Sequence, residues 1–134
     1  LEELANHSGL LGVSGISGDI RDIEAAAAEG HEDAQLALDL FIDEIRRHLG
    51  GLLIAMGGAD VIVFTGGIGE NSTTVRTGVC RELDELGIQL DAEANRRVEG
   101  ESAMQATTSR TQIWVVPTNE EIVVARQTKQ LLEG

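Results

Sequence analysis

A chain of 134 residues is long enough for one domain, and its 42% apolar content can fill a core, which must be aliphatic because only 2% of the residues are aromatic. The formal net charge of −13 argues against nucleic acid or an anionic membrane as partner, since both require clustered Lys and Arg. The single cysteine, Cys80, cannot form an internal disulfide, and no apolar run nears the ~20 residues of a membrane span, so we expect a cytoplasmic protein.

The first half of the chain predicts helices separated by small residues. Because the chain starts at Leu1 in the middle of a helical pattern, we interpret it as a piece of a longer protein. A loop rich in Gly and Ser over residues 8–18 ends at Asp19, a good N-cap for a short helix over about 20–29. Apolar residues then recur at spacings of three and four over 32–56, which predicts a long helix ended by two glycines. Its stripe, which could supply a core or a subunit contact, is Leu38, Phe41, Ile42, Ile45, Leu49, Leu52, Leu53 and Met56.

The second half alternates strands and helices. A continuous apolar run at 60–64 predicts a strand buried on both faces, followed by a glycine-rich turn and a helix over 70–83 capped by Asn71 or Ser72. Weaker patterns predict a short strand at 87–90, a short helix at 91–98, a weak strand at 102–106, a second buried strand at 112–116 and a final helix over 119–132. This order predicts a single α/β domain over residues 1–134, with a mixed sheet flanked by helices.

The stretch VIVFTGGIGENS, residues 61–72, places glycines between a strand and a helix N-terminus. Free N–H groups and the helix dipole converge at such a point and favour an anion or a nucleotide. A P-loop is excluded because no Lys-Ser/Thr follows at the required spacing. A dinucleotide fingerprint is only approached, because Ser72 replaces its third glycine. A tight turn without a ligand is the alternative.

Two further stretches carry polar residues next to predicted element ends. Asp19 could bond a ligand hydroxyl while Arg21 stacks or reaches a phosphate; alternatively, Asp19 caps a helix and Arg21 is a solvated charge. Beyond the second buried strand, a carboxylate in the stretch PTNEE, residues 117–121, could hold a divalent cation, or it could complement the helix dipole.

Taken together, three stretches resemble one family. DVIVFTGGIGENSTTVR resembles the C-terminal signature of acetate kinases and the related propionate kinases, and SGLLGVSGISGDIRDIE and VVPTNEEIVVARQTK match the same family in the same order. The resemblance covers nearly the whole chain, but only the C-terminal third of the family's length.

The resemblance implies the fold of the actin, hexokinase and Hsp70 superfamily, in which ATP lies between two RNase H-like α/β domains. It assigns an adenosine-contacting element to Asp19, Ile20 and Arg21. It assigns the loop that holds the nucleotide to Gly67, Ile68, Gly69, Glu70 and Asn71. It makes Glu120 the ligand of Mg²⁺.

The resemblance also implies a function that this segment shares with the rest of a larger enzyme. The parent would transfer the γ-phosphoryl group of ATP to acetate or propionate, reversibly, as a cytoplasmic homodimer. The catalytic residues and the carboxylate pocket of the family lie upstream, so we expect none in this segment, which would bind ATP or ADP and Mg²⁺ yet be inactive alone. A non-catalytic α/β module for dimerisation or regulation is the alternative.

Overall fold

The computed structural model describes residues 8–118 and 127–132. In chain order its elements are α2 (Gly9–Ser14), α3 (Ile20–Ala28), α4 (Glu32–Met56), β1 (Val61–Phe64), α5 (Gly66–Asn71), α6 (Thr73–Cys80), the 3₁₀ helix η1 (Asp84–Leu86), α7 (Ala92–Arg96), β2 (Ser102–Ala103) and β3 (Gln112–Val115). Residues 127–132 are also helical. The alternation of helices and strands confirms the predicted α/β class.

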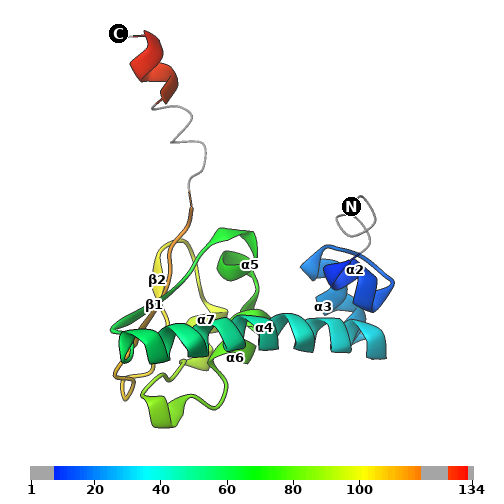
Figure 1. The fold of residues 1–134 in the computed structure, drawn as a ribbon, viewed down its shortest axis with the longest axis horizontal. Coiled ribbons are helices and arrows are strands. Elements are labelled where there is room, and N and C mark those ends of the chain that lie inside the picture. The colour runs from blue at the N-terminus through cyan, green and yellow to red at the C-terminus, as the bar shows by residue number, and fades with distance from the viewer. Residues whose placement is uncertain (1–7, 119–126, 133–134) are drawn as a thin grey trace.

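Helix α4 runs along the long axis of the molecule, and α2, α3 and α6 pack on it (Figure 1). Its bounds are those predicted, and Gly57 ends it in the left-handed region with φ 76°. Helices α2 and α3 lie on its N-terminal half, while α6 contacts it further along. The approach of α6 is close, because a Cβ on Gly78 would lie 2.7 Å from Cδ1 of Ile42.

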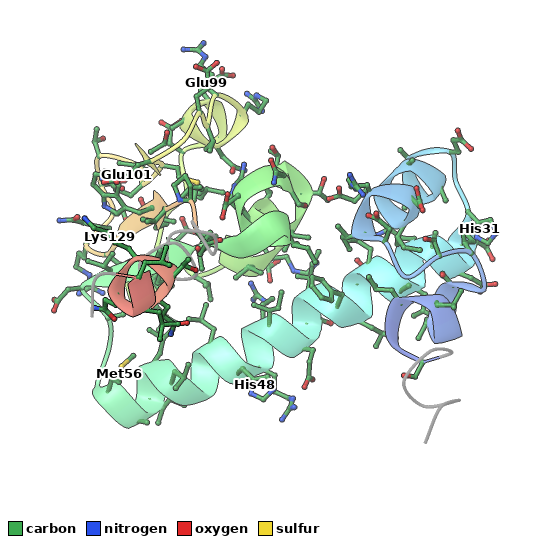
Figure 2. The ribbon with its side chains drawn as sticks, turned by 90° about the horizontal axis from the view of Figure 1, so that it is seen from above. His31, His48, Met56, Glu99, Glu101 and Lys129 are labelled. Carbon is green, nitrogen blue, oxygen red and sulfur yellow. The ribbon has the colours of Figure 1, made fainter. Side chains whose placement is uncertain are left out.

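The predicted apolar stripe of α4 divides into a buried and an exposed part. Leu38 and Ile42 are 3% and 4% exposed and belong to the core. Leu52 and Met56 are 57% and 64% exposed, and Met56 lies at the C-terminal end of the helix (Figure 2). The stripe is therefore fully buried only in its N-terminal part, while Phe41, Ile45, Leu49 and Leu53 are partly buried and pack against the core.

The sheet has three strands in the order β1-β3-β2. Strand β1 pairs parallel to β3, with Ile62 opposite Ile113, and β2 pairs antiparallel to β3. The mixed sheet is as predicted, but the burial of β1 on both faces is not. Ile62 and Phe64 point into the core, while Val61 and Val63 are 44% and 50% exposed, because the described helices cover one face only.

Two segments expected to be irregular contain short helices. The Gly- and Ser-rich loop over 8–18 includes α2, where Leu10 packs against the core and Gly15 ends the helix at φ 65°. The glycine-rich turn is itself the helix α5, which starts at Gly66 with φ 71°. In both segments a glycine at positive φ sets a helix boundary rather than an open loop.

The remaining predictions shift at their boundaries. The helix expected over 70–83 begins after Ser72, which caps α6 by accepting a hydrogen bond from the N–H of Val75, and it ends at Cys80. The strand expected at 87–90 is a single bridge between Leu90 and Gln105. Helix α7 and strand β2 confirm the two other weak patterns, in shortened form.

A buried guanidinium joins α5, α6 and α7. Arg76 on α6 is 1% exposed, and its Nη1 donates to the carbonyl oxygens of Gly69 at 2.9 Å and Glu70 at 2.8 Å. Its Nε donates to Oδ1 of Asn95 at 2.6 Å, and its Nη2 donates to the carbonyl oxygen of Asn95 at 3.0 Å. The last carbonyls of α5, which lack partners within that short helix, are satisfied in this way.

We expect Arg76→Met to lower the free energy of unfolding by at least about 2 kcal/mol, because each buried acceptor left unsatisfied costs about 1–3 kcal/mol. Urea denaturation followed by circular dichroism measures the change. Arg97→Met is the matched control: Arg97 pairs with Glu93 at the surface and its side chain is 79% exposed, so its loss should stay below about 1 kcal/mol. Equal losses in the two variants would contradict the structural role of Arg76.

Candidate functional site: a cavity between α3 and α5

A cavity of about 500 Å³ brings together two of the three sequence stretches. Both α3 and α5 stand on the same side of α4 (Figure 1) and contribute to its walls. The lining residues are Asp19, Ile20, Arg21, Glu24, Gly67, Ile68, Asn71 and Ser72. The volume lies within the range of small-molecule sites, about 300–1,000 Å³.

The wall from α3 begins with its N-cap. Asp19 accepts a hydrogen bond from the N–H of Arg21 at 2.9 Å and pairs with the Arg21 guanidinium, whose Nε lies 3.0 Å from Oδ1. These hydrogen bonds from Arg21 lower the pKa of Asp19 to about 2, so this carboxylate is ionised at neutral pH. Asp19 is thus a helix cap, as one of the two interpretations of the sequence stated. The Arg21 side chain is 82% exposed, as a solvated charge would be, but it is paired with Asp19.

The wall from α5 presents backbone and small groups to the cavity. Gly67 lines it, and outside the backbone of α5 itself no atom lies within 4 Å of the position where a Cβ would stand. Ile68 also lines it while packing against the core, which offers an apolar surface. The amide of Asn71 donates through Nδ2 to the carbonyl oxygen of Gly67 at 2.8 Å, which fixes its orientation.

Two residues of the predicted nucleotide loop, Gly69 and Glu70, do not line the cavity. A Cβ on Gly69 would lie 3.3 Å from the carbonyl carbon of Phe64, so this glycine lets α5 pack closely against the end of β1. The carboxylate of Glu70 accepts hydrogen bonds from the N–H and the hydroxyl of Thr118, at 2.9 and 3.1 Å. These contacts, first that with the Thr118 N–H, lower the pKa of Glu70.

Charges along the cavity are mostly negative. Asp19 is balanced by Arg21, while Glu24 accepts a hydrogen bond from the hydroxyl of Ser72 and carries the remaining carboxylate. Among the described lining residues, Arg21 is the sole cation. A neutral group with hydroxyl or amino donors therefore suits the cavity better than a phosphate does.

The predicted cation ligand, Glu120, lies outside the described residues, which stop at Thr118 and resume at residue 127. Within the described ranges no group of three or more His, Cys, Asp or Glu side chains is arranged to hold a metal ion. His31, which caps the N-terminus of α4, and His48 within α4, for example, lie far apart (Figure 2). Over the same ranges, no helix has both the length and the apolar character of a membrane span.

Three residues around the site were missed by the sequence analysis. Glu24 follows Ile20 by one helical turn, so helical periodicity could have placed it on the same face. Arg76 lies on the buried face of α6 with Val75 and Val79. A single charged residue among apolar residues at helical spacing could have indicated that its side chain is buried. Thr118 gave no signal, because its contact with Glu70 spans 48 residues of sequence.

A further cavity, of about 510 Å³, lies at the C-terminal end of α4. Its walls are formed by the C-terminal turns of α4, residues 57–59 that follow α4, the end of η1, and Ile88, Arg110 and Thr111. None of the predicted site residues in the described part of the chain lines it.

Comparison with known proteins identifies the family. A model described as "Acetokinase family" matches residues 1–126. The acetate kinase of Heliobacterium modesticaldum is 49% identical over 127 residues, covering 95% of this chain and 32% of the relative. The propionate kinase of Yersinia enterocolitica is 50% identical over 121 residues, covering 90% and 29%. The chain therefore spans about a third of the length of these relatives.

Solved structures agree. The acetate kinase of Porphyromonas gingivalis superimposes with a TM-score of 0.86 at 43% identity, covering 98% of this chain and 33% of that one. A propionate kinase from Francisella tularensis superimposes with a TM-score of 0.81 at 33% identity, covering 93% and 33%. The α/β fold is accordingly part of the actin-like ATPase fold expected from the sequence, and the chain belongs to the acetokinase family.

Proposed function

We propose that this chain is the nucleotide-binding part of an acetate or propionate kinase, which transfers the γ-phosphoryl group of ATP to a short-chain carboxylate and gives ADP and acyl phosphate, reversibly. The supporting observation is the cavity, in which residues 19–21 and the α5 residues Gly67, Ile68 and Asn71 form facing walls. Acetate and propionate kinases match the chain at nearly equal identity, so the proposal covers both carboxylates.

The chemistry of the cavity supports the nucleoside half of ATP as its occupant. Ile20 and Ile68 offer apolar contacts to a purine, and the carboxylates of Asp19 and Glu24 can accept from ribose hydroxyl or base amino groups. The phosphates would lie beyond the cavity, because the only cationic group in its described lining is the Arg21 guanidinium, which is already paired with Asp19. Groups from the rest of the parent and a divalent cation would neutralise them.

For the cation we propose Mg²⁺ held by Glu120, whose carboxylate is the kind of ligand that Mg²⁺ prefers. The observation that supports a cation near the cavity is the position of Thr118, which lies two residues before Glu120 and is hydrogen-bonded to Glu70 on α5. The start of this segment is thereby held at the helix that lines the cavity. When bound, the cation would neutralise charge on the transferred phosphoryl group.

The proposal extends to the setting of the parent enzyme. A cytoplasmic homodimer is proposed, and the exposed apolar residues Leu52, Ile54 and Met56 at the end of α4 are compatible with a subunit contact. Carboxylate binding and catalysis are assigned to the parent outside this segment. If the parent bound no nucleotide, the non-catalytic module would be the remaining alternative.

Gly67→Leu in the full-length protein should raise the KM for ATP at least about tenfold, because a side chain there enters open space that we assign to the nucleoside. Steady-state kinetics with varied ATP measure it. Gly51→Leu is the matched control, since Gly51 is an exposed α4 glycine that also has open space around it and lies outside the cavity. An unchanged KM for ATP in a folded Gly67→Leu protein would contradict the assignment of the cavity to the nucleotide.

Glu120→Ala in the full-length protein should raise the Mg²⁺ concentration needed for half-maximal rate, by roughly tenfold or more for a lost carboxylate ligand. Glu121→Ala provides the matched control and should change it much less. A magnesium titration at saturating ATP compares the two variants. Equal effects would show that the wrong carboxylate was assigned.

The purified 134-residue chain should unfold cooperatively yet show no acetate or propionate kinase activity. Loss of one stabilising donor can cost roughly 10²–10³ in rate, and this segment lacks an entire side of the proposed cleft. A coupled kinase assay against the full-length protein tests this expectation. Turnover near that of the full-length protein would contradict the proposed division of labour.

A further inference from the structure

The carboxylate of Glu70 bridges two segments that are far apart in sequence. Its Oε1 accepts from the N–H of Thr118 at 2.9 Å and from the Thr118 hydroxyl at 3.1 Å. Glu70 is half-buried and does not contribute to the described lining of the cavity. Its side chain is thus engaged by the protein itself.

The position of this contact matters because the backbone hydrogen bonds of the sheet end just before Thr118. The last backbone hydrogen bond between β1 and the chain that follows β3 runs from the N–H of Val116 to the carbonyl oxygen of Phe64, at 3.0 Å. Pro117 has no N–H to donate. Thr118 is therefore the next residue that can donate through its backbone, and Glu70 takes up both of its donors.

Both ends of the contact border parts of the proposed site. On one side, Glu70 follows Gly67 and Ile68 in a helix whose final carbonyls are held by buried Arg76, so its backbone is well fixed. On the other side, Thr118 precedes the proposed cation ligand Glu120 by two residues. A hydrogen-bonded carboxylate at this point can transmit the position of one segment to the other.

We propose that Glu70 is a positioning residue, which holds the segment after β3 against α5 and so sets the proposed cation ligand relative to the nucleotide cavity, instead of contacting the nucleotide itself. This inference rests on the proposed function. It assigns the two neighbours in the sequence different tasks: Asn71 faces the cavity, while Glu70 faces Thr118.

The test uses the full-length protein and the variants Glu70→Ala, Glu70→Gln, Thr118→Val and the double variant Glu70→Ala/Thr118→Val. Glu70→Ala should raise the Mg²⁺ concentration for half-maximal rate roughly tenfold, as for other residues that orient a metal ligand. The KM for ATP at saturating Mg²⁺ should change less than about threefold. Glu70→Gln keeps an acceptor oxygen and should restore most of the Mg²⁺ response.

The double variant separates positioning from independent effects. If Glu70 acts through Thr118, the double variant should be no worse than Glu70→Ala alone, because Glu70→Ala already removes the acceptor of both Thr118 donors and Thr118→Val removes only the hydroxyl. Glu101→Ala and Thr107→Val are matched controls, which remove an exposed carboxylate and an exposed hydroxyl elsewhere. Additive losses, or a Glu70→Ala effect confined to the KM for ATP, would overturn the proposal.

A second readout does not depend on activity. Hydrogen exchange of the peptide containing Thr118, followed by mass spectrometry, should speed up in Glu70→Ala and stay unchanged in Glu101→Ala, because Glu70 protects the Thr118 amide. Unchanged exchange in Glu70→Ala would overturn the contact. If the full-length protein lacked kinase activity, the proposed function would fail, and the exchange result would still decide whether Glu70 holds this segment.

Discussion

The packing of α3 and α6 on α4 is the constraint from which the candidate site follows. Ile23 of α3 and Val79 of α6 are almost fully buried against a core that includes Leu38 and Ile42 of α4. Because α4 is one continuous helix, it fixes the distance between the two groups that pack on it. The hydrogen bond from Ser72 to Glu24 spans the same gap. The cavity between α3 and α5 is the space that this arrangement leaves.

The short helix α5 depends on support from outside itself. Six residues, with glycines among them, form a poor helix by propensity. Arg76 satisfies the carbonyls at its end, and Gly69 permits close packing on β1. The polar groups of α5 are therefore divided between the cavity and the protein interior, which allows backbone to approach a ligand without leaving buried groups unpaired.

The charge of the segment constrains what it can do by itself. With a net charge of −13 and Arg21 already paired with Asp19, the described cavity has little to offer a polyphosphate. The proposed nucleoside site in this segment is consistent with the proposed phosphate neutralisation elsewhere in the parent, since like charges repel strongly when they are desolvated. The length of the relatives, about three times the part matched here, leaves room for those groups.

The sequence by itself determined the α/β class, the bounds of α4, the cap at Asp19 and the residues that carry the family signature, because helical periodicity and capping are local. Only the tertiary structure decided that β1 is covered on one face, since burial depends on which helices lie nearby. It also decided that Gly67 lines the cavity while Gly69 packs against Phe64, and that Glu70 accepts a hydrogen bond from Thr118. These outcomes arise from contacts between residues far apart in the chain, for which sequence spacing carries no information.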